Sequence, residues 1–182
     1  MKMFRKLSSQ ELERTDLKGY KEMVKAPVVL VLDNVRSQHN IGSAFRTSDA
    51  FLVEKIVLCG ICAVPPSPEI HKSALGAEFS VEWSYSRDTL EAVRELKGLG
   101  YSIIGIEQTQ NSTMLGEFEM KEGAKYAMVF GNEVKGVSQA VIDECDECIE
   151  IPQWGTKHSL NVSVSVGVVL WEVLHKKLSQ RL

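Results

Sequence analysis

The segment KHSLNVSVSVGVVLWEVL, residues 157–174, decides how the C-terminal part of this chain folds. From Ser159 to Val166 polar and apolar residues alternate, which is typical of a half-buried strand. Five apolar residues of the segment instead share one face at helical spacing: Leu160, Val164, Val168, Trp171 and Leu174. Ser159 is a favourable helix N-cap, and the chain's other apolar runs lack such alternation. We therefore predict a helix that begins near Ser159 and packs through this apolar face.

Short apolar runs alternate with helical patterns along the rest of the chain. Strands are predicted at 27–33, 55–60, 81–85, 101–107, 126–133 and 148–152, and helices at 8–25, 40–52, 87–100 and 138–145. This alternation predicts an α/β fold with a mainly parallel sheet and helices on both faces. We divide the chain into a basic N-terminal helical extension, residues 1–25, and an α/β domain, residues 26–182.

Charge is distributed unevenly along the 182 residues, whose formal net charge is −3. Residues 1–25 hold seven Lys or Arg against four acidic residues, and residues 173–182 hold three basic residues and no acidic one, which leaves about −9 for the body. Basic ends suit a polyanionic partner, although solvated helix ends explain them equally well. The chain is not basic enough to resemble a DNA-binding domain. With no membrane-length apolar run and no signal-peptide pattern, we expect a cytoplasmic protein without a membrane partner.

Two motif classes are excluded by their details. The pairs Cys59/Cys62 and Cys145/Cys148 are separated by 82 residues, whereas zinc ribbons place about 15–20 residues between such pairs. We therefore expect ordinary reduced cysteines and no metal site. The stretch GNEVKGVS, residues 131–138, has the glycine spacing of a phosphate loop, but Val137 stands where the phosphate-binding Lys is required. A nucleoside triphosphatase is thereby excluded.

Three stretches place polar residues beside glycine at the ends of predicted strands, where open α/β sheets bind ligands. They are HNIGSAFRTSDAF (39–51), VFGNEVKGVS (129–138) and IPQWGTKHSLNVSVSVG (151–167). In order and spacing they resemble three motifs of the SpoU/TrmH family of RNA ribose 2′-O-methyltransferases, over about residues 27–175. The matching positions are Asn40, Gly42 and Arg46; Phe130, Gly131, Glu133 and Gly136; and Ile151, Pro152, Gly155 and Ser159 to Ser163.

The resemblance implies a knotted α/β fold of the SPOUT type, with a deep C-terminal trefoil knot, and a homodimer whose active sites take residues from both subunits. It also implies that S-adenosyl-L-methionine is held by backbone groups of three loops. The implied cofactor-binding residues are Ile106, Glu107, Gln108, Gly131, Ile151 and Leu160, and the implied catalytic residues are Arg46, Asn40, Glu133, Ser159 and Asn161.

Several roles stay open at the level of the residues. Arg46 is implied to act as a base with help from an RNA phosphate, but free arginine has a pKa above about 12, so stabilising a developing alkoxide is an equal alternative; a structural ion pair is a third. Asn40 lies 240° around a helix from Arg46 and either caps the helix or serves catalysis. Glu133 either pairs with Arg46 or caps the helix that follows it. Ser159 and Asn161 either line the site or act as helix caps.

The substrate is expected to be RNA. Relatives that act on ribosomal RNA often carry an additional N-terminal RNA-binding domain, whereas relatives that act on transfer RNA include short chains with small terminal extensions. The basic ends of this chain fit the second pattern, so tRNA is favoured over rRNA. The alternative is a non-catalytic RNA-binding member of the same fold, which the intact Arg46, Glu133, Ser159 and Asn161 disfavour.

Overall fold

A parallel β-sheet forms the centre of the computed structural model, which describes residues 3–8 and 10–179. Within this range seven strands lie in the order β3-β2-β1-β6-β4-β7-β5, and each neighbouring pair is parallel. The bounds are β1 Ala26–Asp33, β2 Val53–Cys59, β3 Glu82–Ser86, β4 Tyr101–Ile106, β5 Thr113–Met114, β6 Lys125–Phe130 and β7 Glu147–Glu150. The predicted α/β class with a mainly parallel sheet is confirmed.

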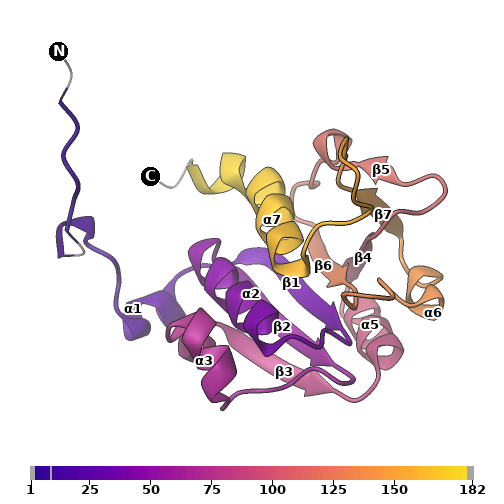
Figure 1. The fold of residues 1–182 in the computed structure, drawn as a ribbon, viewed down its shortest axis with the longest axis horizontal. Helices are drawn as coiled ribbons and strands as arrows, with labels where there is room; N and C mark the ends of the chain where they lie inside the picture. The colour runs from indigo at the N-terminus through magenta and orange to yellow at the C-terminus, as the bar shows by residue number, and fades with distance from the viewer. Residues whose placement is uncertain (1–2, 9, 180–182) are drawn as a thin grey trace.

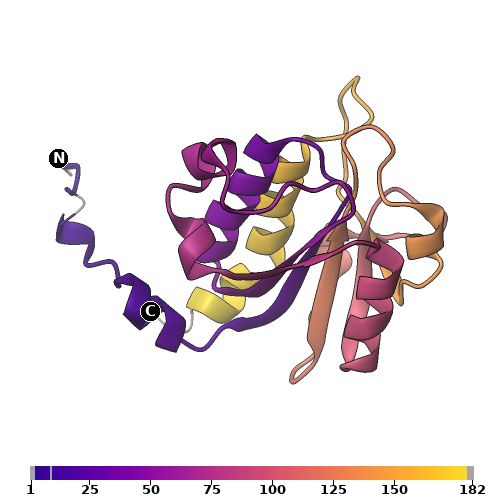
Figure 2. The same cartoon turned by 90° about the horizontal axis from the view of Figure 1, so that it is seen from below.

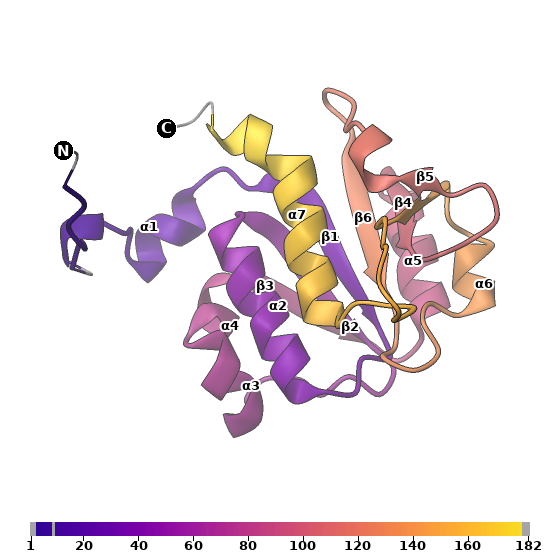
Figure 3. The same cartoon turned by 45° about the horizontal axis from the view of Figure 1, so that its top comes forward.

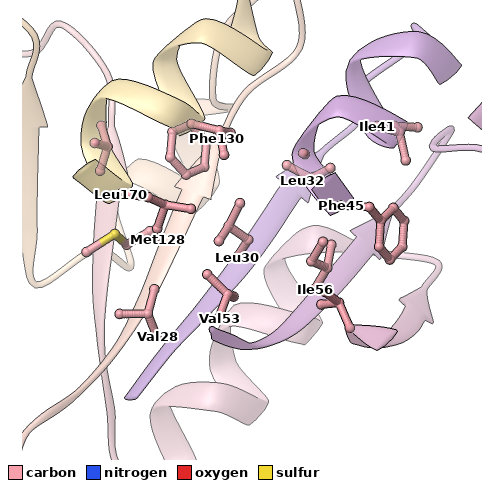
Figure 4. Packing of buried hydrophobic residues seen from close by; sticks show 14 of the residues in the cluster. Val28, Leu30, Leu32, Ile41, Phe45, Val53, Ile56, Met128, Phe130 and Leu170 are labelled. Carbon is pink, nitrogen blue, oxygen red and sulfur yellow. The ribbon is translucent and has the colours of Figure 1, made fainter. Parts of the chain in front are cut away.

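Helices cover both faces of this sheet (Figure 1). Their bounds are α2 Gln38–Ala50, α3 Pro68–Ala74, α4 Ala77–Ser80, α5 Thr89–Gly98, α6 Gln139–Ile142 and α7 Val162–Ser179, with short 3-10 turns at Gln10–Leu12 and Leu115–Glu117. Alternate residues of β1 enter two separate cores because successive strand side chains point to opposite faces. Leu30 packs in the cluster that contains Phe45 of α2 and Leu170 of α7 (Figure 4), whereas Val29 packs with Val93 of α5.

Helix α7 confirms the helical interpretation of the C-terminal segment, but it begins at Val162 rather than near Ser159. The side chain of Asn161 accepts the N–H of Ser163 at 2.9 Å and therefore caps the helix in place of Ser159. The predicted packing face is wrong as well. Of its five residues only Leu174 is buried, while the other four are 38–59% exposed. The face that packs against the sheet instead carries Val166, Val169, Leu170 and Val173.

The single helix predicted over residues 8–25 is also wrong. A short turn at Gln10–Leu12 is followed by Glu13 in the left-handed region (φ 46°), and a new helix, α1, spans Leu17–Glu22. Asp16 starts this helix by accepting the N–H of Gly19 at 2.7 Å. The segment reaches away from the body (Figures 1 and 2), yet Tyr20 is only 5% exposed and joins the main core. The domain boundary at residue 26 stays a prediction.

The four cysteines are free, as expected. Burial raises the pKa of the Cys59 thiol to about 12 and that of Cys62 to about 11, which keeps both protonated near neutral pH. In the described part of the chain, no helix is long and apolar enough to cross a membrane. The strand order does not report on the predicted knot, which stays a prediction.

Candidate active site

The three loops singled out from the sequence leave the sheet from neighbouring strands. Ile106, the last residue of β4, lies opposite Phe130 of β6 and Ile149 of β7. Because the strands are parallel, the loops that follow them emerge side by side at the carboxyl edge of the sheet. The N-terminal ends of α2 and α7 face the same edge, and α2 and α7 lie against each other (Figure 3).

A chain of hydrogen bonds joins one residue from each of the three motifs. The Asn161 Nδ2 atom donates to Asn40 Oδ1 at 3.2 Å, and Asn40 Nδ2 donates to Glu133 Oε1 at 3.1 Å. Asn40 is 7% exposed, so its amide group is largely shielded from water and both of its polar atoms have partners. The structure thus brings together three residues separated by about 90 and 120 positions in sequence. We call this chain the Asn161–Asn40–Glu133 relay.

Glu133 also holds the beginning of α2. Its carboxylate accepts the backbone N–H groups of Arg36 and Ser37 at 3.0 and 2.9 Å. Burial by itself raises the pKa of Glu133, but these two N–H groups and the Asn40 amide lower it more, so the pKa lies below its usual value. Glu133 therefore remains a carboxylate at neutral pH. It neither pairs with Arg46 nor caps the helix that follows it, the two roles that the sequence suggested. It instead fixes Arg36 and Ser37, the two residues directly before α2, and Ser37 is the N-cap of that helix.

The three loops at this edge are connected to each other by side chains of residues that the sequence analysis predicted to bind the cofactor. Glu107 Oε2 accepts the backbone N–H of Val137 at 3.0 Å, and Gln108 Nε2 donates to the His158 carbonyl at 2.9 Å. Gly131 is required by its surroundings, since a Cβ at this position would lie 2.1 Å from the carbonyl carbon of Gly136. Ile106 and Ile151 are half-buried at the base of their loops. The loops are therefore connected to one another by these contacts.

A second connection, centred on Asp33, was missed by the sequence analysis. Asp33 ends β1, is 1% exposed, and accepts hydrogen bonds from the Thr89 hydroxyl at 2.6 Å and the Ser138 N–H at 3.0 Å. Its neighbour Asn34 accepts from Asn132 Nδ2 through its backbone carbonyl at 2.7 Å. Asp33 and Asn34 thus fix the loop 131–138 to the carboxyl end of β1 through Ser138 and Asn132. The sequence feature that could have indicated this role is an acidic residue directly after the apolar run PVVLVL.

Arg46 lies apart from the relay. Its side chain is exposed on α2 and forms no hydrogen bond or ion pair with any residue that the structure describes. Six residues separate it from Asn40, which corresponds to about 9 Å along the helix and about 240° around it. A structural ion pair within this chain is therefore not its role, and its guanidinium is free to meet an anion.

Ser159 and Leu160 line an open cavity of about 460 Å³ next to the relay. The other lining residues are Pro152, Gln153, Trp154, Gly155, Thr156, Lys157 and Asn161. The size falls within the range of small-ligand sites, and the wall carries short polar groups and one cation. Among the described residues, no group of three His, Cys, Asp or Glu is arranged to hold a metal ion.

Comparison with known proteins identifies relatives over most of the chain. The profile of the SpoU rRNA Methylase family matches residues 27–171. The 23S rRNA (guanosine-2′-O-)-methyltransferase of Neisseria meningitidis serogroup B is 32% identical over 84% of this chain and 60% of its own length. The chain therefore spans about 60% of the length of the first curated relatives that it matches.

Solved structures show the same architecture. A TrmH/SpoU tRNA modifying enzyme of A. aeolicus superimposes with a TM-score of 0.79 at 25% identity, covering 91% of this chain and 84% of that one. An AdoMet-bound rRNA methyltransferase of Sinorhizobium meliloti superimposes with a TM-score of 0.78 at 24% identity, covering 87% of this chain and 60% of that one. The family match and these superpositions agree on the fold and on the region that contains the three motifs.

Proposed function

Because the chain belongs to the SpoU rRNA methylase family, we propose that it transfers a methyl group from S-adenosyl-L-methionine to a ribose 2′-hydroxyl of RNA. The observation that carries this proposal is the Asn161–Asn40–Glu133 relay, which joins the three motifs at the carboxyl edge of the sheet. The Arg46 side chain is not part of the relay and has no partner among the described residues. Its guanidinium therefore remains available for an RNA phosphate or a developing oxyanion.

The connected loops suit a cofactor that is recognised through backbone groups. The tight contact of Gly131 with Gly136 leaves no room for a side chain there, and Glu107 and Gln108 fix the loops to one another. We assign cofactor binding to Ile106, Glu107, Gln108, Gly131, Ile151 and Leu160. When bound, S-adenosyl-L-methionine supplies a methyl group already activated by its sulfonium.

The protein's own task is then to orient the ribose hydroxyl and to stabilise the charge that develops on its oxygen. We assign the charge stabilisation to Arg46, because a guanidinium keeps its proton and binds phosphate and alkoxide oxygens. Asn40 and Glu133 are positioning residues, since their polar atoms are already engaged in the relay. Ser159, at the cavity wall, orients the hydroxyl. Asn161 also lines the cavity, but its Nδ2 donates to Asn40 and its Oδ1 accepts from Ser163, so it is a third positioning residue.

A homodimer is part of the proposal. Val164, Val168 and Trp171 of α7, together with Leu160 just before the helix, form an apolar stripe whose side chains are 38–59% exposed. This pattern fits a helix that packs against a second copy. The distance along α2 between Arg46 and the relay also fits a site completed by a partner subunit. Val164→Glu should convert the dimer to a monomer in light scattering and remove methyl transfer; a dimeric variant would contradict this interface.

We propose tRNA rather than rRNA as the substrate, and hence a cytoplasmic site of action. Residues 3–8 and 10–25 reach away from the body, apart from the buried Tyr20, and they carry most of the basic residues of the N-terminal segment (Figure 1). Contacts between such basic side chains and RNA phosphates do not depend on the RNA sequence, and their affinity falls as the salt concentration rises. The basic side chains of Lys176 and Lys177 and residue Arg181 lie outside the described residues.

The test is methyl transfer from radiolabelled S-adenosyl-L-methionine to tRNA and to rRNA, followed by mapping of the methylated nucleotide. Incorporation into the ribose of tRNA supports the proposal, and incorporation into rRNA alone would correct the substrate. Binding of S-adenosyl-L-methionine without incorporation into either RNA would favour the non-catalytic alternative. Base methylation in place of ribose methylation would refute the proposed reaction.

A further inference from the structure

The side chain of Trp154 is 91% exposed at the rim of the cavity that holds Ser159 and Asn161. Such exposure is unusual because a tryptophan normally buries most of its large apolar surface. Trp154 makes no ring contact or hydrogen bond with the residues that the structure describes. The loop that carries it projects beyond the strand ends (Figure 2).

The other two tryptophans are engaged. Trp83 of β3 packs against the main core, and Trp171 of α7 meets Phe51 edge to face at 6.4 Å and stacks on His175 at 5.2 Å. Trp154 is therefore the tryptophan whose two ring faces are open to a ligand.

The residues that follow Trp154 in its loop include polar and cationic side chains. Gly155, Thr156, Lys157 and His158 follow it in sequence and are all exposed. This composition differs from the apolar stripe of Leu160, Val164, Val168 and Trp171, which is the better protein-binding surface of the two. A flat aromatic ring beside a lysine is the combination with which proteins bind single-stranded nucleic acids, since bases stack on the ring and phosphates meet the cation.

We propose that Trp154 is the stacking platform for a nucleobase of the RNA, either that of the methylated nucleotide or its immediate neighbour, with Lys157 at the adjacent phosphate. This inference rests on the proposed RNA methyl transfer and adds a substrate-binding residue to it. Stacking at the rim orients the nucleotide, so that its ribose enters the cavity and lies against Ser159 and Asn161 at the wall. Because the ring stacks on any base, Trp154 contributes affinity and placement, while base identity is read elsewhere.

The experiment compares Trp154→Ala, Trp154→Phe and, as a matched loss of an exposed ring, Phe79→Ala on α4, which is 59% exposed. Base–aromatic stacking is worth about 1–3 kcal/mol, so Trp154→Ala should raise the Kd and KM for tRNA by about 5- to 150-fold. Trp154→Phe should recover most of this loss, and Phe79→Ala should behave as wild type. The Kd for S-adenosyl-L-methionine and the molar mass in light scattering should stay unchanged in all three variants.

A second readout does not depend on methyl transfer. Titration with oligoadenylate should quench the tryptophan fluorescence of the wild type, and Trp154→Phe should lose most of that quenching. Wild-type tRNA affinity in Trp154→Ala, or a Trp154→Phe variant as weak as Trp154→Ala, would overturn the proposal. A changed molar mass would instead assign Trp154 to the subunit interface, and a weakened cofactor Kd would assign it to the cofactor site; both overturn it. If the wild type binds RNA with quenching but transfers no methyl group, the proposed function fails while the stacking role stands.

Discussion

Gly131→Ala is the sharpest single test of the loops that we propose to bind the cofactor. A methyl group at this position would lie 2.1 Å from both the Gly136 carbonyl carbon and the Val137 nitrogen. These are backbone atoms, so they cannot move aside in the way that the end of a flexible side chain can. The loop 131–138 must therefore either strain or open.

Opening and staying closed cost different amounts of free energy. Opening the loop breaks the two hydrogen bonds between Asn132 and Gly136, at 3.1 and 2.9 Å, which costs about 2 kcal/mol at about 1 kcal/mol each. Staying closed costs at least about 1–3 kcal/mol, the usual range for overpacking, and a backbone contact at 2.1 Å belongs at its upper end. We expect the loop to open, with a loss of about 2 kcal/mol in unfolding free energy.

Opening removes the backbone surface proposed to hold S-adenosyl-L-methionine, so the Kd measured by calorimetry should rise at least about tenfold, or about 1.4 kcal/mol. The matched control is Gly98→Ala at the end of α5, where a Cβ meets no atom within 4 Å. This control should bind the cofactor as wild type does and be equally or slightly more stable, because alanine is the better helix former. Wild-type cofactor affinity in Gly131→Ala would refute the reasoning.

Three further predictions concern the charged residues. Arg46→Ala should lower kcat by about 100-fold or more while calorimetry shows an unchanged cofactor Kd; retained activity would remove Arg46 from the site. Asp33→Ala leaves the Thr89 hydroxyl and the Ser138 N–H without their buried acceptor, and should cost about 2–4 kcal/mol in urea unfolding; a loss below about 0.5 kcal/mol would contradict the role of Asp33. The folded pKa of Glu133 is lowered, so its stabilisation is present above the unfolded value of about 4.3 and is lost as the pH falls through the folded pKa. The unfolding free energy of Glu133→Gln should therefore be lower than that of the wild type by about 1 kcal/mol at pH 7, a small value because the position is largely exposed. This difference should shrink below about pH 4.3. A difference independent of pH would show that the carboxylate charge is not involved.

Periodicity and motif order predicted the sheet, its parallel direction and the loops that meet at its edge, because each depends on local pattern. They could not predict the relay, since Asn40, Glu133 and Asn161 meet only when three distant segments are folded together. The role of Glu133 was missed for the same reason. Its partners are the backbone N–H groups of Arg36 and Ser37, and every residue type except proline has such a group, so the sequence does not identify them. The short α3 was not predicted because Pro68, which usually indicates a break, stands at the first turn, where proline is tolerated.

The alternation in KHSLNVSVSVGVVLWEVL has a physical explanation that neither the strand nor the one-faced helix provides. Val162 and Val166 lie on the face of α7 that packs against the sheet, whereas Leu160, Val164 and Val168 are exposed. Each set repeats every four residues, and the two sets are offset by two residues, or 200° around a helix. A helix that is apolar on two opposite sides therefore shows the period of a strand. Two apolar sides imply two partners, and the described part of the chain supplies one of them. The exposed stripe begins at Leu160, which also lines the cavity beside the relay, so a second copy docked on it would shape the active site directly.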